Sequence, residues 1–155
     1  MPPNTDFPSP VSDVIIVNYK TPALCLDCLE SLYEGSEGSE GSAEILVVDN
    51  ASGDDSVEII NRSIADNNRT NTRAIPSEVN AGFSAGNNIG IKQSNGDFIL
   101  LLNSDTIVRP SAIDLLVQTL IDNPDMGMAS PRLEWPDDQP QESCFRFHRP
   151  INELI

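Results

Sequence analysis

Apolar residues follow two different periods along this chain. Short, continuous apolar runs occupy residues 14–17, 45–48 and 99–102, and each run is followed by polar residues and then by a segment with helical spacing. Runs of this length are typical of strands that are buried on both faces of a parallel sheet. We predict strands at 14–17, 45–48, 73–76 and 97–102, with 99–102 in the centre of the sheet, and a fifth strand at 126–129.

Helical spacing fills the intervals between the predicted strands. It predicts helices over about 23–33 and 84–93, a helix whose face carries Val57, Ile60 and Ile64, and a last helix between Pro110 and Asn123. Strands that alternate with helices at this spacing imply a parallel sheet with right-handed crossovers. The predicted fold class is a doubly wound α/β domain, which we place at residues 13–135.

Three segments lie outside this pattern. Residues 1–12 contain four prolines and no periodicity, so we expect a disordered N-terminal arm. Residues 34–43 repeat Glu-Gly-Ser and should form a flexible loop. Residues 136–155 are rich in proline and polar residues, and we expect an irregular segment there. No chemistry is assigned to any of the three.

The charge of the chain limits its ligands. Nine Lys and Arg residues against twenty-four Asp and Glu give a formal net charge of -15. Such a field repels polyanions, which argues against nucleic acid as a partner. A phosphate ligand would need a divalent cation, backbone N–H groups or a few arginines to reverse the field locally. No apolar run is long enough for a membrane span and the start lacks signal character, so we expect a cytoplasmic protein.

Several familiar sites are disfavoured. Cys25 and Cys28 form a C-x-x-C, but on a helix they share its apolar stripe, and no second cysteine or histidine pair completes a zinc site. We therefore interpret them as packing residues. The turn at 18–22 contains no glycine, and neither a dinucleotide fingerprint nor a P-loop is present.

An acidic residue follows two of the predicted strands within three positions. Asp49 ends the second apolar run, and Asp105 comes three residues after the run at 99–102. In open α/β sheets, ligands bind beyond the carboxyl ends of the strands. The position of Asp105 therefore predicts a site for a metal-bound phosphate.

Four motifs in order carry a resemblance to a known family. They are VIIVNY at 14–19, VVDNAS at 47–52, NAGFSAGNNIG at 80–90 and LNSD at 102–105. Together they resemble the family 2 inverting glycosyltransferases, and their style is similar to the bacterial rhamnosyltransferase-like branch. The resemblance implies a GT-A fold: a Rossmann-like, doubly wound, mainly parallel sheet flanked by helices, here incomplete at its C-terminal end.

The resemblance also implies a nucleotide site. An ionised Asp49 can only accept hydrogen bonds, which suits the imide N–H of uracil or thymine. A glycine-rich turn before a helix suits a phosphate. Three alternatives stay open: Asp49 as a plain turn cap, Tyr19 as a packed aromatic, and 80–90 as an ordinary helix entry. The implied nucleotide-binding residues are Val17, Tyr19, Asp49, Asn80, Gly82 and Asn103.

By the same resemblance, Asp105 is a ligand of Mn²⁺ or Mg²⁺ that is bound to the donor diphosphate. Hard cations take oxygen ligands, and one or two carboxylates suffice when phosphates supply the rest. Asn103 stands where the usual D-x-D motif has its first acid, so one anionic ligand is missing. It would coordinate through its amide oxygen or bind the ribose. The alternative is that Asp105 only caps the end of a strand.

The implied activity is transfer of a sugar from a UDP- or dTDP-linked donor to a hydroxyl of a saccharide or lipid-linked acceptor, with inversion. The setting implied is bacterial cell-envelope polysaccharide synthesis, in the cytoplasm or, for a longer protein, at the inner face of the membrane. No catalytic residue is assigned in this chain, because the general base is expected downstream of Ile155. We therefore expect the N-terminal, donor-binding part of a longer enzyme, which would expose sheet surface and self-associate.

Two rival interpretations remain. One is a non-catalytic nucleotide-binding or interaction domain of GT-A-like fold. The other is an α/β scaffold without a nucleotide site. A carboxylate motif beyond Ile155 would favour the enzyme, and its absence would favour the binding module.

Overall fold

The computed structural model describes residues 12–34 and 44–141. The expected N-terminal arm, the Glu-Gly-Ser loop and residues 142–155 of the irregular segment lie outside these residues. The chain divides into two compact units, the first ending at Ile113 and the second beginning at Asp114. In chain order the elements are β1 (Ser12–Asn18), α1 (Pro22–Glu34), β2 (Ile45–Asp49), α2 (Ser56–Asp66), β3 (Thr72–Pro76), α3 (Phe83–Ile91), β4 (Phe98–Asn103) and α4 (Ala112–Asp122).

The first unit is built on a four-stranded parallel sheet in the order β3-β2-β1-β4. Because all four strands run the same way, their carboxyl ends lie at one edge. Asn18 is paired with Asp49 there, and Val17 with Asn103. The predicted α/β class with a parallel sheet is confirmed, and the residues after β1, β2 and β4 are brought to the same edge.

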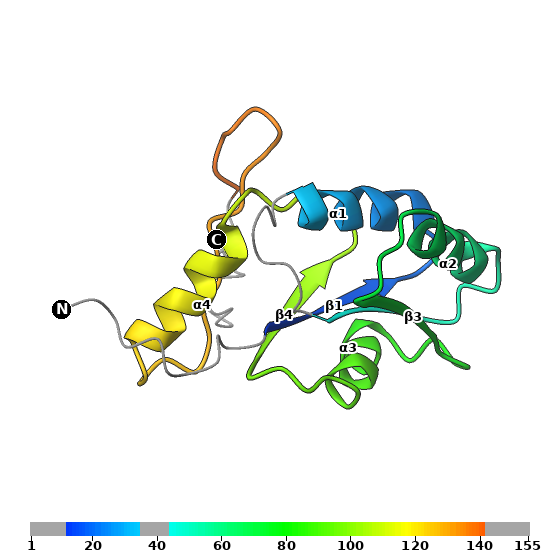
Figure 1. The fold of residues 1–155 in the computed structure, drawn as a ribbon, viewed down its shortest axis with the longest axis horizontal. Helices are drawn as coiled ribbons and strands as arrows, with labels where there is room; N and C mark the ends of the chain where they lie inside the picture. The colour runs from blue at the N-terminus through cyan, green and yellow to red at the C-terminus, as the bar shows by residue number, and fades with distance from the viewer. Residues whose placement is uncertain (1–11, 35–43, 142–155) are drawn as a thin grey trace, which may run out of the picture. The chain divides into compact units, whose positions relative to one another are not determined.

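Helices cover both faces of this sheet, as Figure 1 shows for α1 and α2 on one side and α3 on the other. Alternate residues of β1 face opposite sides. Val14 and Ile16 pack with Leu29 of α1 and the α2 residue Ile60. Ile15 packs on the other face with residues of β2 and β3 and with Ile89 of α3. The continuous apolar runs are therefore explained by burial on both faces.

Two glycines let α3 approach β1 closely. A Cβ added to Gly90 would lie 2.5 Å from Cγ2 of Ile15, and one added to Gly86 would lie 2.9 Å from Cγ1 of Val17. Gly86 and Gly90 are four residues apart on α3, and they lie against Val17 and Ile15, which are two residues apart on β1. The helix therefore runs in the direction opposite to the strand. A larger side chain at either position would require the side chain of Ile15 or Val17, or the backbone, to shift.

Asp13 joins three segments at the amino-terminal edge of the sheet. Its Oδ1 accepts a hydrogen bond from the N–H of Glu44 at 3.1 Å. Its Oδ2 accepts the hydroxyl of Ser94 at 2.7 Å and the N–H groups of Asn95 at 2.9 Å and Gly96 at 2.8 Å. Burial raises the pKa of this carboxyl, but the four hydrogen bonds outweigh burial and hold the pKa below its ordinary value of 3.8.

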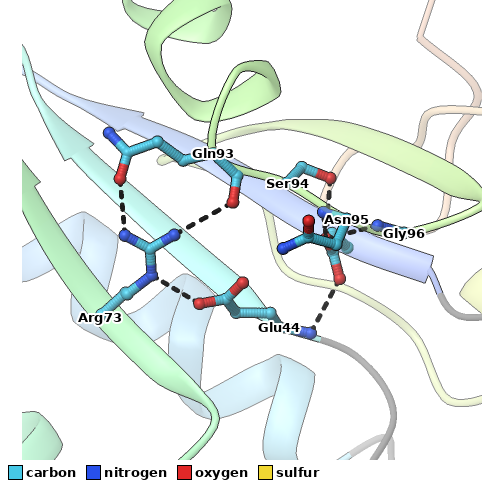
Figure 2. Close-up of polar contacts among 7 residues, drawn as sticks. Glu44, Arg73, Gln93, Ser94, Asn95 and Gly96 are labelled. Carbon is cyan, nitrogen blue, oxygen red and sulfur yellow. Dashed lines mark hydrogen bonds and ion pairs between the residues drawn. The ribbon is translucent and has the colours of Figure 1, made fainter.

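Arg73 of β3 links two further segments at the same edge of the sheet. In Figure 2, Arg73 reaches both Glu44 and Gln93. Its Nε donates to Oε1 of Glu44 at 2.5 Å, and its Nη1 donates to Oε1 of Gln93 at 2.6 Å. These contacts fix the start of β2 and the end of the α3 segment, opposite the edge where the candidate site lies.

Two expectations about the strands are wrong. In the described part of the chain β4 pairs with β1 alone, so it is an outer strand and not a central one. Its Ile99 and Leu101 side chains are 41% and 48% exposed. The pattern of apolar residues does not encode strand order, so a continuous apolar run predicts a strand buried on both faces even where the strand is an outer one.

The expected fifth strand is also absent: residues 126–129 form no strand among the described residues. Gly127 interrupts this short run, which has no β-branched residue, and Met128 is 83% exposed. The second unit instead has an isolated antiparallel bridge between Glu134 and Pro140. In the segments that the structure covers, no helix is long and apolar enough to cross a membrane.

Candidate functional site

Asp49 is the last residue of β2 and is only 3% exposed. Its Oδ1 accepts a hydrogen bond from Nδ2 of Asn18 at 2.8 Å and another from Oγ of Ser52 at 2.6 Å. Its Oδ2 accepts the N–H of Ser52 at 3.0 Å. These contacts are the turn cap that the sequence left open as an alternative. A carboxylate has about four acceptor positions, and these contacts use three of them.

Backbone contacts fix the loops after β1 and β2 against each other. The N–H of Asn50 donates to the carbonyl of Asn18 at 2.8 Å, and the N–H of Lys20 donates to Oγ of Ser52 at 2.9 Å. Lys20 and Ala51 both have left-handed backbones, with φ of 59° and 57°. Residues with a Cβ adopt this conformation at a cost of roughly 1 kcal/mol, and such strain is concentrated at functional sites.

Asn80 connects the end of β2 with the start of α3. Its Oδ1 accepts Nδ2 of Asn50 at 2.9 Å and the N–H of Gly82 at 3.0 Å. Gly82 has φ of 90°, and a Cβ placed on it would have nothing within 4 Å. Because Oδ1 is occupied, Asn80 offers a ligand its amide N–H groups. The structure thus places Asn80 and Gly82 beside Asn50, the residue after Asp49, and their role in nucleotide binding stays a prediction.

Val17 and Tyr19 differ in their environment. The Val17 side chain is buried against Gly86, so it is a core residue. Tyr19 is 45% exposed, and the ammonium group of Lys20 lies 5.4 Å from the centre of its ring.

Asn103 is the last residue of β4, and Asp105 follows the strand at the same edge of the sheet. The N–H of Thr106 donates to the carbonyl of Asn103 at 3.2 Å and closes a turn that contains Asp105. Both Asn103 and Asp105 are exposed. Among the residues that the structure describes, no group of three or more His, Cys, Asp or Glu side chains could hold a metal ion. A divalent cation would fit here only with further oxygen ligands from a bound phosphate.

Cys25 and Cys28 lie on the buried face of α1. Both are fully buried, and neither forms a disulfide. Burial raises the pKa of each thiol to about 12, so both remain protonated. This agrees with the packing interpretation.

The sequence missed two residues of the site, Asn18 and Ser52, which support Asp49. A polar residue that ends an apolar strand, as Asn18 does, was the available signal.

Comparison with known proteins identifies the family. The family model for glycosyl transferase family 2 matches residues 13–143. The chain belongs to this family. A relative, glycosyltransferase GlyG of Streptococcus pneumoniae, is 29% identical over 110 residues, which cover 71% of this chain and 35% of GlyG. An uncharacterized glycosyltransferase of Haemophilus influenzae is 30% identical over 98 residues, 63% of this chain and 36% of that protein. The chain thus spans about a third of the length of these relatives.

Solved structures of GT-A glycosyltransferases share the fold. The mannosyltransferase PcManGT from Pyrobaculum calidifontis, in complex with GDP-Man and Mn²⁺, has a TM-score of 0.68 at 19% identity. The match covers 83% of this chain and 37% of PcManGT. S. aureus TarS 1–349 in complex with UDP-GlcNAc has a TM-score of 0.62 at 23% identity, over 72% of this chain and 31% of TarS.

Proposed function

We propose that this chain is the donor-binding part of an inverting, rhamnosyltransferase-like glycosyltransferase, and that residues 13–135 hold the nucleotide sugar. The donor is a UDP- or dTDP-linked sugar, and the acceptor is a hydroxyl of a saccharide or lipid-linked molecule of a bacterial cell envelope. Family membership supports the reaction class. The complexes of fold neighbours with UDP-GlcNAc and GDP-Man support a nucleoside diphosphate sugar as the ligand.

One observation carries the proposal: the order of the strand ends. β1 lies between β2 and β4, so the chain that continues into Tyr19 leaves the sheet between the strand that ends in Asp49 and the strand that precedes Asp105. Two strand spacings of about 4.8 Å place the ends of β2 and β4 roughly 10 Å apart. That separation suits a nucleoside diphosphate with its base at Asp49, its ribose over β1 and its phosphates at Asp105.

Base recognition follows from the hydrogen-bonding capacity of this edge. The remaining acceptor position of Asp49 suits the imide N–H of uracil or thymine, and the free amide N–H groups of Asn80 suit a carbonyl oxygen of the base. Cytosine and adenine lack an N–H at the matching ring position, so they present the wrong pattern. Tyr19 contributes ring surface, and Gly82 allows close approach of the backbone.

Asp105 would hold Mn²⁺ or Mg²⁺ with its carboxylate, aided by the amide oxygen of Asn103. When bound, such a cation supplies Lewis-acid stabilisation to the leaving diphosphate. In the reaction, the acceptor oxygen forms a bond to the anomeric carbon while the bond from that carbon to the diphosphate oxygen breaks. The acceptor proton passes to a general base, which we place in a part of the enzyme outside this sequence.

A nucleotide panel tests this proposal. Calorimetric titrations of UDP, dTDP, CDP and ADP, each with Mn²⁺, should show binding of the first two and none of the last two at the same concentrations. Equal binding of all four nucleotides would refute base recognition by Asp49 and Asn80. No binding of any nucleotide would refute the proposed function as a whole and favour a scaffold without a nucleotide site.

A further inference from the structure

Helix α1 contacts the loop that carries Asp105 at two points. The Sγ of Cys28 donates a hydrogen bond to the carbonyl of Asn103, at a distance of 3.7 Å. The N–H of Val108 donates to Oγ of Ser31 at 2.9 Å. The two contacts therefore fasten both ends of residues 103–108, which we call the 103–108 loop.

The positions of Cys28 and Ser31 on α1 allow both contacts with the 103–108 loop. Cys28 and Ser31 are one helical turn apart, so they lie on the same face of α1, and both are buried. The hydroxyl of Ser31 donates to the carbonyl of Cys28 at 2.7 Å, which leaves its oxygen as the acceptor for Val108. A neutral thiol is a hydrogen-bond donor, so Cys28 can donate to the carbonyl of Asn103.

Packing alone does not explain the contacts of Cys28 and Ser31 with the 103–108 loop. Cys25 lies one turn earlier on α1, is as fully buried as Cys28 and has an equally raised pKa, but its thiol makes no hydrogen bond to the 103–108 loop. Cys28 thus differs from Cys25 in its hydrogen bond to the 103–108 loop and not in its burial.

We propose that Cys28 and Ser31 are positioning residues, which fix the 103–108 loop so that Asp105 is held in place for a divalent cation on the donor diphosphate. This inference rests on the proposed function. Partners that orient a ligand residue are commonly worth about tenfold or more in metal affinity. A thiol is a weak donor, so Cys28 should affect the position of the turn more than the stability of the fold.

The experiment compares Cys28→Ala and Ser31→Ala with the matched control Cys25→Ala, which removes an equally buried thiol from the same helix. Hydrogen exchange followed by mass spectrometry reports on residues 103–108 without any metal. Electron paramagnetic resonance of free Mn²⁺ in the presence of UDP then gives the metal affinity. Both Cys28→Ala and Ser31→Ala should exchange faster in this segment, and Cys28→Ala should bind Mn²⁺ about tenfold more weakly. Cys25→Ala should match the wild type in both measurements.

The outcomes separate the two proposals. Equal exchange and equal Mn²⁺ affinity of Cys28→Ala and Cys25→Ala would overturn the positioning role, because removal of any buried thiol would then explain the result. A wild-type protein that shows no Mn²⁺ binding with UDP would instead overturn the proposed metal function, while the exchange data would still decide whether Cys28 and Ser31 hold the loop.

Discussion

The buried amide of Asn18 donates a 2.8 Å hydrogen bond to the buried carboxylate of Asp49, between the ends of the two central strands. A hydrogen bond to a charged group contributes about 2 kcal/mol, and its loss inside the protein leaves a carboxylate oxygen less well satisfied. Asn18→Ala should therefore lower the free energy of unfolding by about 2 kcal/mol in urea titrations. The exposed helix residue Asn88 provides the control, and an equal effect of Asn88→Ala would contradict this account.

A second comparison distinguishes base recognition from turn capping at Asp49. Ser52→Ala removes the hydroxyl that donates to Asp49 but leaves the carboxylate in place, whereas Asp49→Ala removes the carboxylate itself. At a temperature where both variants are folded, Asp49→Ala should bind UDP on the order of tenfold more weakly than Ser52→Ala, the loss expected for a hydrogen bond to a charged group. Equal affinities would mean that Asp49 only caps the turn.

The sign of the stability change caused by Gly90→Ala tests the close packing of α3 on β1. In an ordinary helix, replacing glycine by alanine stabilises the protein by about 1 kcal/mol. Here the added Cβ overlaps Ile15, and overpacking of a core costs about 1–3 kcal/mol. Gly90→Ala should therefore lower the melting temperature, while Gly127→Ala, whose Cβ meets nothing within 4 Å, should leave it nearly unchanged. A stabilised Gly90→Ala variant would contradict the close contact of α3 with β1.

Asp13 should make stability depend on acid pH. Its pKa is lower in the folded protein than the ordinary 3.8, so its contribution is fully present above the unfolded pKa and is lost as the pH falls through the folded pKa. At pH 7, Asp13→Asn should be less stable than the wild type by about 2 kcal/mol, because the amide nitrogen would face N–H donors. This difference should shrink below about pH 4. Urea titrations at several pH values measure it, with the exposed Asp66→Asn as control. A difference that stays constant down to pH 2 would contradict the assignment.

The sequence predicted the elements of the sheet well, because its strands at 14–17 and 45–48 are buried on both faces and leave a continuous apolar signal. It did not predict the outer position of β4, since strand order depends on tertiary contacts that hydrophobic spacing does not encode. The fifth strand was predicted from a short run of methionines and alanine around Gly127, and residues this exposed have no core to fill.

The candidate site was predicted in part for the same reason. Asp49 could be singled out because it ends an apolar strand, and Asn80 and Gly82 because they precede a helix, while their role in binding stays a prediction. The contacts of Asn18 and Ser52 to Asp49, and of Cys28 to Asn103, join residues 31, 3 and 75 positions apart. The contact of Cys28 could not be inferred, because a buried thiol in an apolar stripe has the same pattern whether or not it bonds a loop.

The central claim is that Asp105 binds a divalent cation on the donor diphosphate, and the Mn²⁺ dependence of UDP binding tests it most directly. Calorimetric titrations of the wild type should show UDP binding that tightens on the order of tenfold when Mn²⁺ is added. Asp105→Ala should bind UDP equally with and without Mn²⁺, whereas Asp66→Ala should behave like the wild type. Identical wild-type titrations with and without Mn²⁺, or an Asp105→Ala variant that keeps the full metal effect, would contradict the account.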